Sequence, residues 1–219
     1  MPHDDVPEPP GGVYAAVLKR LSDFFFAGLL LVALAPVMVA TAVIIRVVLG
    51  RPVLFLSERA GREGRAFRLV KFRSMSEARD GDGRLLPDAA RLGRLGRLLR
   101  RTSLDELPQL FNVLVGHMSL IGPRPLPMRY TSRYTPRQAA RLLVRPGLSG
   151  WAQIHGRNAL GWDDRLELDA QYVEFLGRWY APAVDLWIAV VTAFQIVYQS
   201  LTGRGVAAPG SATMTEFNP

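Results

Sequence analysis

The sequence predicts a mainly helical α+β fold that is anchored to a membrane through its N-terminal part. Residues 24–45 form one uncharged, apolar run that is long enough to cross a hydrocarbon core as a helix. Residues 53–57 and 66–74 are rich in β-forming side chains and enclose a glycine-containing turn, which is typical of a small β-hairpin. The remaining chain shows helix-forming segments separated by glycine and proline.

Length and composition limit the possible organisation and function. A chain of 219 residues suits one well-packed domain with appendages. The formal net charge is +8, and nearly all of the positive charge is arginine, which suits bidentate contacts with phosphate. A coding preference for arginine explains the excess equally well, and a basic surface can bind nucleic acid, anionic lipid or a phosphorylated small molecule. The absence of cysteine excludes disulfides, thiolate catalysis and cysteine-ligated zinc.

The N-terminal part is predicted as a disordered leader over residues 1–13, followed by a membrane helix over residues 14–50. Pro36 lies in the middle of the apolar run, where it removes a helical hydrogen bond and clashes with the preceding turn. Basic residues flank both ends of this run, namely Lys19, Arg20, Arg46 and Arg51. A simple span usually has its basic residues biased to the cytoplasmic side. A kinked single span and a helix that returns to its side of entry therefore both fit the residues.

Residues 51–202 are predicted as the domain that carries the chemistry. After the hairpin, the expected elements are an exposed mobile loop at 77–87, a basic helix at 89–101, a helix at 104–115 ended by Gly116, an irregular segment at 122–127, a helix at 136–144 capped by Thr135, a short strand at 151–157 and an amphipathic helix at 162–179. Most of these segments are short, so their type depends on caps and turn residues.

Residues 181–198 form a second apolar segment, which Asp185 and Gln195 interrupt. The segment can be a core helix, an interfacial helix or a second span. We favour a core or interfacial helix, because a charge inside a span is energetically costly. Residues 203–219 are predicted as a flexible C-terminal tail.

The adjacent carboxylates Asp105 and Glu106 are the candidate reactive groups. Ser103 and Glu106 have the spacing of a capping box, which places both carboxylates at a helix N-terminus, where the helix dipole stabilises anions. Arg100, just upstream with Arg101, would help to keep Asp105 ionised. An ionised carboxylate can attack phosphorus, and its neighbour can hold a divalent cation. Taken alone, however, this pattern is more typical of a simple helix cap.

Several cations surround the pair in positions where the backbone is expected to be stiff. Lys71 and Arg73 alternate along a predicted strand, so they share one face. Arg124 lies within Gly-Pro-Arg-Pro, and Arg145 precedes Pro-Gly. A third group, Gln153, His155 and Arg157, alternates along the predicted strand at 151–157. Each cation alone is more typical of a solvated charge, but the set indicates a site for a nucleotide diphosphate.

Over about residues 19–187 these motifs resemble the monotopic phosphoglycosyl transferases, also called the bacterial sugar transferase family. The matching segments, in family order, are Lys-Arg-x-x-Asp at 19–23, the proline-broken apolar helix, Lys-Phe-Arg-Ser-Met at 71–75, Ser-Leu-Asp-Glu-Leu-Pro-Gln-Leu-Phe-Asn-Val at 103–113, Met-Ser-Leu-Ile-Gly-Pro-Arg-Pro at 118–125, Arg-Pro-Gly at 145–147, Gly-Trp-Ala-Gln at 150–153 and Gly-Arg-Asn at 156–158. The chain departs from the family at Ala35, where serine is common, and at His117, where an acidic residue is common.

The resemblance implies a two-step transfer at the cytoplasmic face of the bacterial inner membrane, as the first membrane step of glycan assembly. Asp105 would attack a UDP-sugar, release UMP and carry the phospho-sugar until undecaprenyl phosphate, a polyprenol phosphate, accepts it. Glu106 would bind Mg²⁺, and Arg100 would orient the site. The helix broken at Pro36 would be re-entrant, so that the active site lies at the membrane surface. Residues expected near phosphate or nucleotide are Lys71, Arg73, Arg124, Arg145, Gln153 and Arg157.

Two other functions fit parts of the sequence. A non-catalytic, membrane-anchored protein would use the arginines to bind anionic lipid or nucleic acid, but no recognisable nucleic-acid-binding motif is present, so no nucleic acid partner is expected. A hydrolase would use the same carboxylates and pass the phosphate to water. The sequence leaves open the sugar, the glycan pathway and the oligomeric state.

Overall fold

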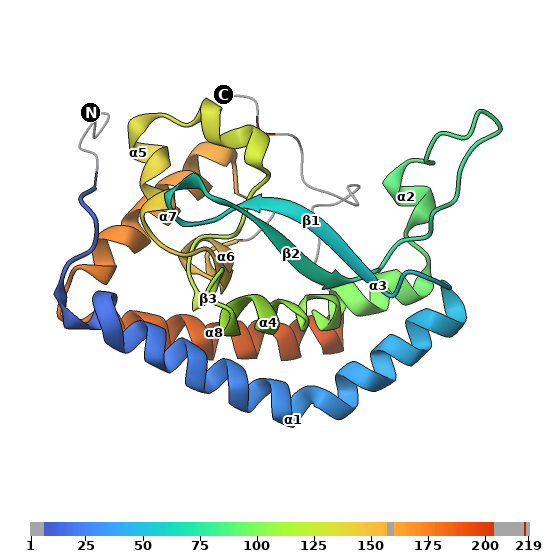
Figure 1. The fold of residues 1–219 in the computed structure, drawn as a ribbon, viewed down its shortest axis with the longest axis horizontal. Coiled ribbons are helices and arrows are strands. Elements are labelled where there is room, and N and C mark those ends of the chain that lie inside the picture. The colour runs from blue at the N-terminus through green and yellow to red at the C-terminus, as the bar shows by residue number, and fades with distance from the viewer. Residues whose placement is uncertain (1–6, 157–159, 204–216, 218–219) are drawn as a thin grey trace.

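A computed structural model describes residues 7–156, 160–203 and 217, and the statements below refer to this part of the chain. Helix α1 (Lys19–Val48) continues from the π-helical turn η1 (Tyr14–Leu18) and follows one side of the molecule as a bent rod (Figure 1). Pro36 lies inside α1 and does not end it. Proline is a common cause of such bends. Re-entrant insertion of α1 stays a prediction.

The predicted hairpin is confirmed and lies across the molecule from α1. Strand β1 (Leu54–Ala60) pairs antiparallel with β2 (Ala66–Phe72), in a register that runs from Leu54 opposite Phe72 to Ala60 opposite Ala66. The connecting turn η2 (Arg62–Gly64) contains two residues with positive φ, Glu63 and Gly64. Strand β1 extends to Ala60, three residues beyond the predicted end at 57.

Helix α4 (Gln109–Leu114) lies between α1 and β2 and connects them through a hydrophobic core (Figure 1). The buried side chains of this core are Ala27, Phe67, Leu69, Leu110, Val113 and Met118. The helix ends as predicted, since Gly116 has a φ of +88°, a left-handed conformation that glycine adopts easily. The carboxylates just before α4 are thereby held next to both α1 and the hairpin.

A second, parallel sheet was not predicted. Strand β3 (Ser119–Ile121) pairs with β4 (Gly147–Ser149), so that two segments far apart in the sequence lie side by side. The approach is close: a Cβ on Gly147 would lie 2.1 Å from the backbone nitrogen of Gly122. Three-residue strands are too short for the alternation of side chains to show in a sequence.

Two predicted helices are broken in the structure. The basic segment forms α2 (Asp88–Arg91) and α3 (Arg94–Arg101), separated where Leu92 leaves the helical region with a ψ of 86°. The segment predicted at 104–115 begins as a 3₁₀ turn, η3 (Leu104–Glu106), and becomes α-helical only at α4. A weak helix former, Gly93, stands at the first break, and Pro108 separates η3 from α4.

The predictions for the following segments were confirmed in part. Thr135 caps α5 (Pro136–Ala139) in a complete capping box with Gln138, and the chain continues as 3₁₀ helix η5 (Ala140–Leu143). The strand predicted at 151–157 is wrong, because residues from Trp151 to Ile154 form helix α6 after the extended Gly150. The turn η4 (Met128–Arg133) follows the irregular segment, and the loop at 77–87 is mostly exposed. Its predicted mobility is not tested.

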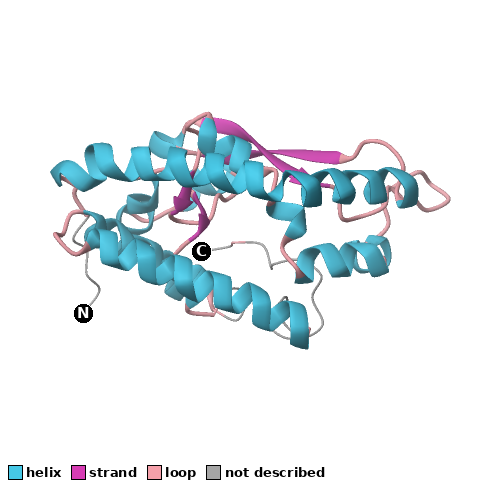
Figure 2. Ribbon diagram, turned by 90° about the horizontal axis from the view of Figure 1, so that it is seen from below, coloured by secondary structure: helices cyan, strands magenta, loops and turns pink. Residues whose placement is uncertain are grey.

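The C-terminal half ends in two longer helices, α7 (Trp162–Leu176) and α8 (Ala181–Thr202). Figure 2 shows α1 and α8 from their side of the molecule. Both are long and apolar enough to cross a membrane. Asp185 near the start of α8 is buried and accepts hydrogen bonds from Tyr14, Lys19 and Tyr172, at 2.6, 2.7 and 2.8 Å. Because Lys19 neutralises this carboxylate, its charge no longer argues against a span.

Most of the predicted tail at 203–219 lies outside the described residues, except for Gly203, which ends α8 with a φ of +71°, and Phe217. The side chain of Phe217 is buried against the rings of Tyr130, Tyr134 and Trp162. Its backbone N–H donates to the Tyr130 hydroxyl at 3.2 Å, and its carbonyl accepts from Arg133 at 2.6 Å. At this residue the chain is therefore packed against the domain.

Candidate active site

Asp105 and Glu106 lie in the 3₁₀ turn η3 and not at the start of a long helix. Ser103 has a φ of +56° and makes no capping hydrogen bond through its side chain, so the predicted capping box is wrong. Ser103 instead follows the last turn of α3, and its backbone N–H donates to the carbonyl of Arg100 in that helix. Its left-handed conformation explains why its hydroxyl does not reach the next turn. The electrostatics of the pair therefore depend on surrounding side chains.

Glu106 is held by two cations. Its Oε1 accepts from Lys71 Nζ and from Arg124 Nη2, each at 2.7 Å. The side chain is 19 % exposed. Burial acts to raise the pKa of Glu106, but the charges of Arg124 and Lys71 outweigh it and hold that pKa well below its usual range. Glu106 is thus a permanently ionised group that orients two cations.

Asp105 has a different environment although it is the next residue. It is 8 % exposed, and no hydrogen bond or ion pair joins its carboxylate to any residue within 7–156, 160–203 or 217. Burial raises its pKa to about 6, with a further contribution from Glu106, while Lys71, Arg100 and Arg124 oppose the shift. At neutral pH the carboxylate is ionised, more basic than usual and uncommitted, in the sense that it has no hydrogen-bond or ion-pair partner among the described residues. These are the properties of a nucleophile.

The structure brings some of the other predicted residues close to the pair. Lys71 and Arg124 contact Glu106 directly, and Arg100 donates from Nε to Ser74 Oγ at 3.2 Å. These three residues also line one large cleft together with Asp105 and Glu106. Arg124 lies on the rigid loop after β3, as the Gly-Pro-Arg-Pro motif predicted.

Other predicted residues are placed differently. Arg73 borders the cleft, but its guanidinium donates to the backbone carbonyls of Leu49 and Arg51, so it joins the end of α1 to β2. Arg145 donates to the carbonyl of Gly116 at 2.9 Å and is not among the residues that line the cleft. Gln153 lines the cleft from helix α6. Arg157 lies outside the described residues.

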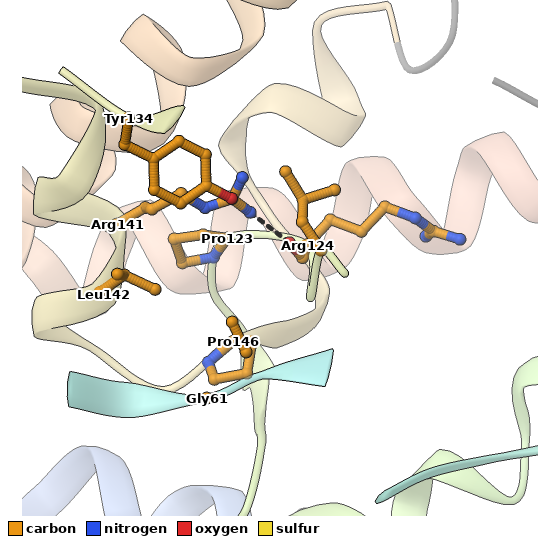
Figure 3. A pocket seen from close by; sticks show the side chains of 9 residues that line it. Gly61, Pro123, Arg124, Tyr134, Arg141, Leu142 and Pro146 are labelled. Atoms are coloured by element: carbon orange, nitrogen blue, oxygen red, sulfur yellow. Dashed lines mark hydrogen bonds between the residues drawn. The ribbon is translucent and has the colours of Figure 1, made fainter. Parts of the chain in front are cut away.

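Two residues that the sequence interpretation missed, Arg141 and Asp169, support the backbone of Arg124. Figure 3 shows Arg141 reaching the backbone of Arg124, whose carbonyl accepts a hydrogen bond from Arg141 Nη2. The same guanidinium forms a 3.3 Å ion pair with Asp169 that lacks hydrogen-bond geometry. Burial raises the pKa of Asp169 to about 6 against the charges of Arg141 and Arg165. The sequence signal that could have identified Asp169 was its position as an acidic residue on the apolar face of the predicted helix at 162–179.

The donor atoms at the site suit a hard divalent cation. Both cationic contacts of Glu106 fall on Oε1, which leaves Oε2 without a hydrogen bond to any described residue. Mg²⁺ is usually bound by one or two carboxylates together with substrate phosphates. Among the described residues, no group of three acidic, histidine or cysteine side chains could hold a metal without such a substrate.

Comparison with known proteins agrees with this chemistry. The family model described as bacterial sugar transferase matches residues 14–199. An uncharacterized sugar transferase, EpsL, of Bacillus subtilis is 50 % identical over 201 residues, which cover 92 % of this chain and 96 % of that protein.

Two longer relatives have more specific names. A UDP-N-acetylgalactosamine-undecaprenyl-phosphate N-acetylgalactosaminephosphotransferase of Aeromonas hydrophila is 38 % identical, over 90 % of this chain and 46 % of that protein. A UDP-glucose:undecaprenyl-phosphate glucose-1-phosphate transferase of Escherichia coli is 34 % identical, over 82 % of this chain and 40 % of that protein. The chain thus spans less than half the length of these two relatives.

Proposed function

Since the chain belongs to the bacterial sugar transferase family, we propose that it transfers a sugar phosphate from a UDP-sugar to undecaprenyl phosphate, releasing UMP. The product would be an undecaprenyl-diphosphate sugar, formed at the cytoplasmic face of the bacterial inner membrane. The names of the longer relatives support both substrates. The observation that carries the chemistry is the unequal pair: an uncommitted, buried Asp105 beside a Glu106 that two cations hold.

In the first step, a carboxylate oxygen of Asp105 attacks the phosphorus that bears the sugar. A bond forms between this oxygen and phosphorus, and the bond from phosphorus to the bridging oxygen breaks. UMP leaves with the bridging oxygen and its electron pair, and an acyl-phosphate remains on Asp105. In the second step, a phosphate oxygen of the lipid attacks the same phosphorus, and the carboxylate of Asp105 is released unchanged.

The surrounding cations stabilise charge on the phosphates during both steps. Lys71 and Arg124 are fixed by Glu106 before substrate binds, so little reorganisation is needed when charge develops. Arg100 adds a third positive charge near Asp105. Mg²⁺, held by Glu106 and the donor phosphates, would neutralise further charge on the diphosphate. Among these groups only Asp105 forms a covalent bond.

The cleft also suits a lipid acceptor. Its lining changes from the charged residues around Asp105 to apolar side chains of the two long helices, Leu30, Leu34, Ala189, Ala193 and Ile196. A polyprenol phosphate has the same division between a charged headgroup and an apolar chain. We place the acceptor with its phosphate at Asp105 and its chain between α1 and α8. A re-entrant α1, bent around Pro36, would bring this end of the cleft to the membrane surface.

The decisive experiment follows UMP release by the purified full chain in lipid nanodiscs, with a UDP-sugar, Mg²⁺ and undecaprenyl phosphate. Lipid-dependent UMP release is expected for at least one donor. Asp105→Asn should abolish both turnover and the trapped phospho-sugar adduct, whereas Asp82→Asn in the exposed loop should retain full activity. Equal turnover without the lipid would indicate a hydrolase, and full activity of Asp105→Asn would refute the assignment of the nucleophile.

A further inference from the structure

Gln153 is a buried amide whose polar atoms have no partner in the described structure. The residue is 7 % exposed, and neither Nε2 nor Oε1 makes a hydrogen bond to any described residue. Leaving buried polar atoms unpaired costs roughly 1–3 kcal/mol for each group, and native structures rarely do so. Because Gln153 also lines the cleft that contains Asp105, its missing partner is expected to be a ligand of that cleft.

The backbone around Gln153 packs against the loop that carries Arg124. Its Oε1 lies 2.8 Å from the point that a Cβ on Gly150 would occupy. The same point is 2.1 Å from the carbonyl oxygen of Gly122, so the two glycines are in close contact. Gly122 is two residues before Arg124, whose guanidinium contacts Glu106. Gln153 therefore belongs to the wall of the cleft that carries Arg124.

The chemistry of an amide shows which ligand group can satisfy it. Phosphate oxygens at neutral pH act as hydrogen-bond acceptors, so a phosphate would pair with Nε2 and leave Oε1 buried without a donor. A sugar presents hydroxyls that both donate and accept. Gln153 thus presents a donor and an acceptor on one buried amide, and the hydroxyls of a sugar can satisfy both, whereas a phosphate can satisfy only the donor.

We propose that Gln153 binds the sugar of the UDP-sugar donor and contributes to the choice of sugar. Its Nε2 donates to one sugar oxygen, and its Oε1 accepts from a neighbouring hydroxyl or acetamido N–H. The sugar is the assigned part because it stays next to the phosphorus that Asp105 attacks, whereas the base leaves with UMP. This assignment rests on the proposed function and narrows the position near phosphate or nucleotide that the family resemblance implied for Gln153.

The test compares Gln153→Met, which keeps the length of the side chain but removes both polar atoms, with the wild-type chain. kcat/KM is measured in nanodiscs for UDP-glucose, UDP-galactose and their N-acetylated forms, and UMP affinity is measured by calorimetry. We expect kcat/KM for the best donor to fall about tenfold or more, with reduced discrimination among the four donors and UMP affinity unchanged within about twofold. Gln171→Met on α7, away from the cleft, is the matched control.

Two results would overturn the proposal: an equal loss of affinity for UMP, which would assign Gln153 to the base, or unchanged kcat/KM for every donor. If Gln153→Met does not fold, Gln153→Asn replaces it, since it adds no charge and draws the amide back by one methylene group. If the wild-type chain turned over none of the donors, the proposed function itself would fail. Calorimetric binding of the UDP-sugars relative to UMP would still test the role of Gln153.

Discussion

The raised pKa of Asp105 predicts how activity depends on pH. Only the ionised carboxylate can attack phosphorus, so activity should be present above this pKa and lost as the pH falls through it. With a pKa of about 6, roughly nine-tenths of Asp105 is ionised at pH 7 and about one-tenth at pH 5. kcat/KM for UMP release, measured from pH 4.5 to 8.5 at constant ionic strength, should therefore fall about tenfold per pH unit below 6.

The raised pKa of Asp105 also predicts how the stability of the fold depends on pH in the absence of substrate. A carboxyl whose pKa is higher in the folded state than in the unfolded state stabilises the fold below the unfolded pKa, and this stabilisation is lost as the pH rises. A pKa near 6, against about 3.9 in an unfolded chain, corresponds to a penalty of about 3 kcal/mol at pH 7.5 and about 1 kcal/mol at pH 4.5. Asp105→Asn removes the charge and should raise the Tm at pH 7.5 more than at pH 4.5.

The pH profile of kcat/KM and the pH dependence of the Tm are both compared with the same control variant. Asp82→Asn, in the exposed loop, should change neither the acidic limb of the pH profile nor the pH dependence of the Tm. An acidic limb near pH 4, together with a pH-independent effect of Asp105→Asn on the Tm, would show that Asp105 titrates like an ordinary surface carboxylate. The division of roles between Asp105 and Glu106 would then have no electrostatic basis.

Three further substitutions test the supports of the site. Arg141→Met removes the donor to the Arg124 backbone, so kcat should fall about tenfold with little change in the KM for the lipid. Arg141→Lys should recover part of the lost kcat, and an unchanged kcat in Arg141→Met would exclude a positioning role. Lys19→Met leaves Asp185 buried without its cation and should cost about 3 kcal/mol, measured by thermal unfolding; adding Asp185→Asn should restore part of the loss. Phe217→Ala should lower the Tm and speed C-terminal proteolysis, since about 3 kcal/mol of buried aromatic contact is lost; unchanged proteolysis would argue against the packed position.

The sequence predicted the elements whose signals are long or chemically specific. The apolar run of α1, the hairpin and the capping box of Thr135 were all identified, because each depends on residues that are neighbours in the chain or on one repeated pattern. The sheet of β3 and β4 was missed because its two short strands are stabilised by distant pairing. The strand predicted at 151–157 failed because alternation over so few residues does not distinguish a strand from a single helical turn.

The roles of the two carboxylates could not have been derived from their own neighbourhood. The sequence assigned their charge to a helix dipole and to a cap by Ser103, yet neither is present at the three-residue turn η3. What separates the pair is direct contact with Lys71, 35 residues away, and with Arg124, 18 residues away, and both cations donate hydrogen bonds to Glu106 and not to Asp105. Adjacent residues in a tight turn direct their side chains differently. The two cations therefore bind the carboxylate of Glu106 and leave that of Asp105 buried without a direct partner among the described residues. The surrounding fold therefore distinguishes the proposed nucleophile: Asp105 is the carboxylate that makes no direct contact with the cations.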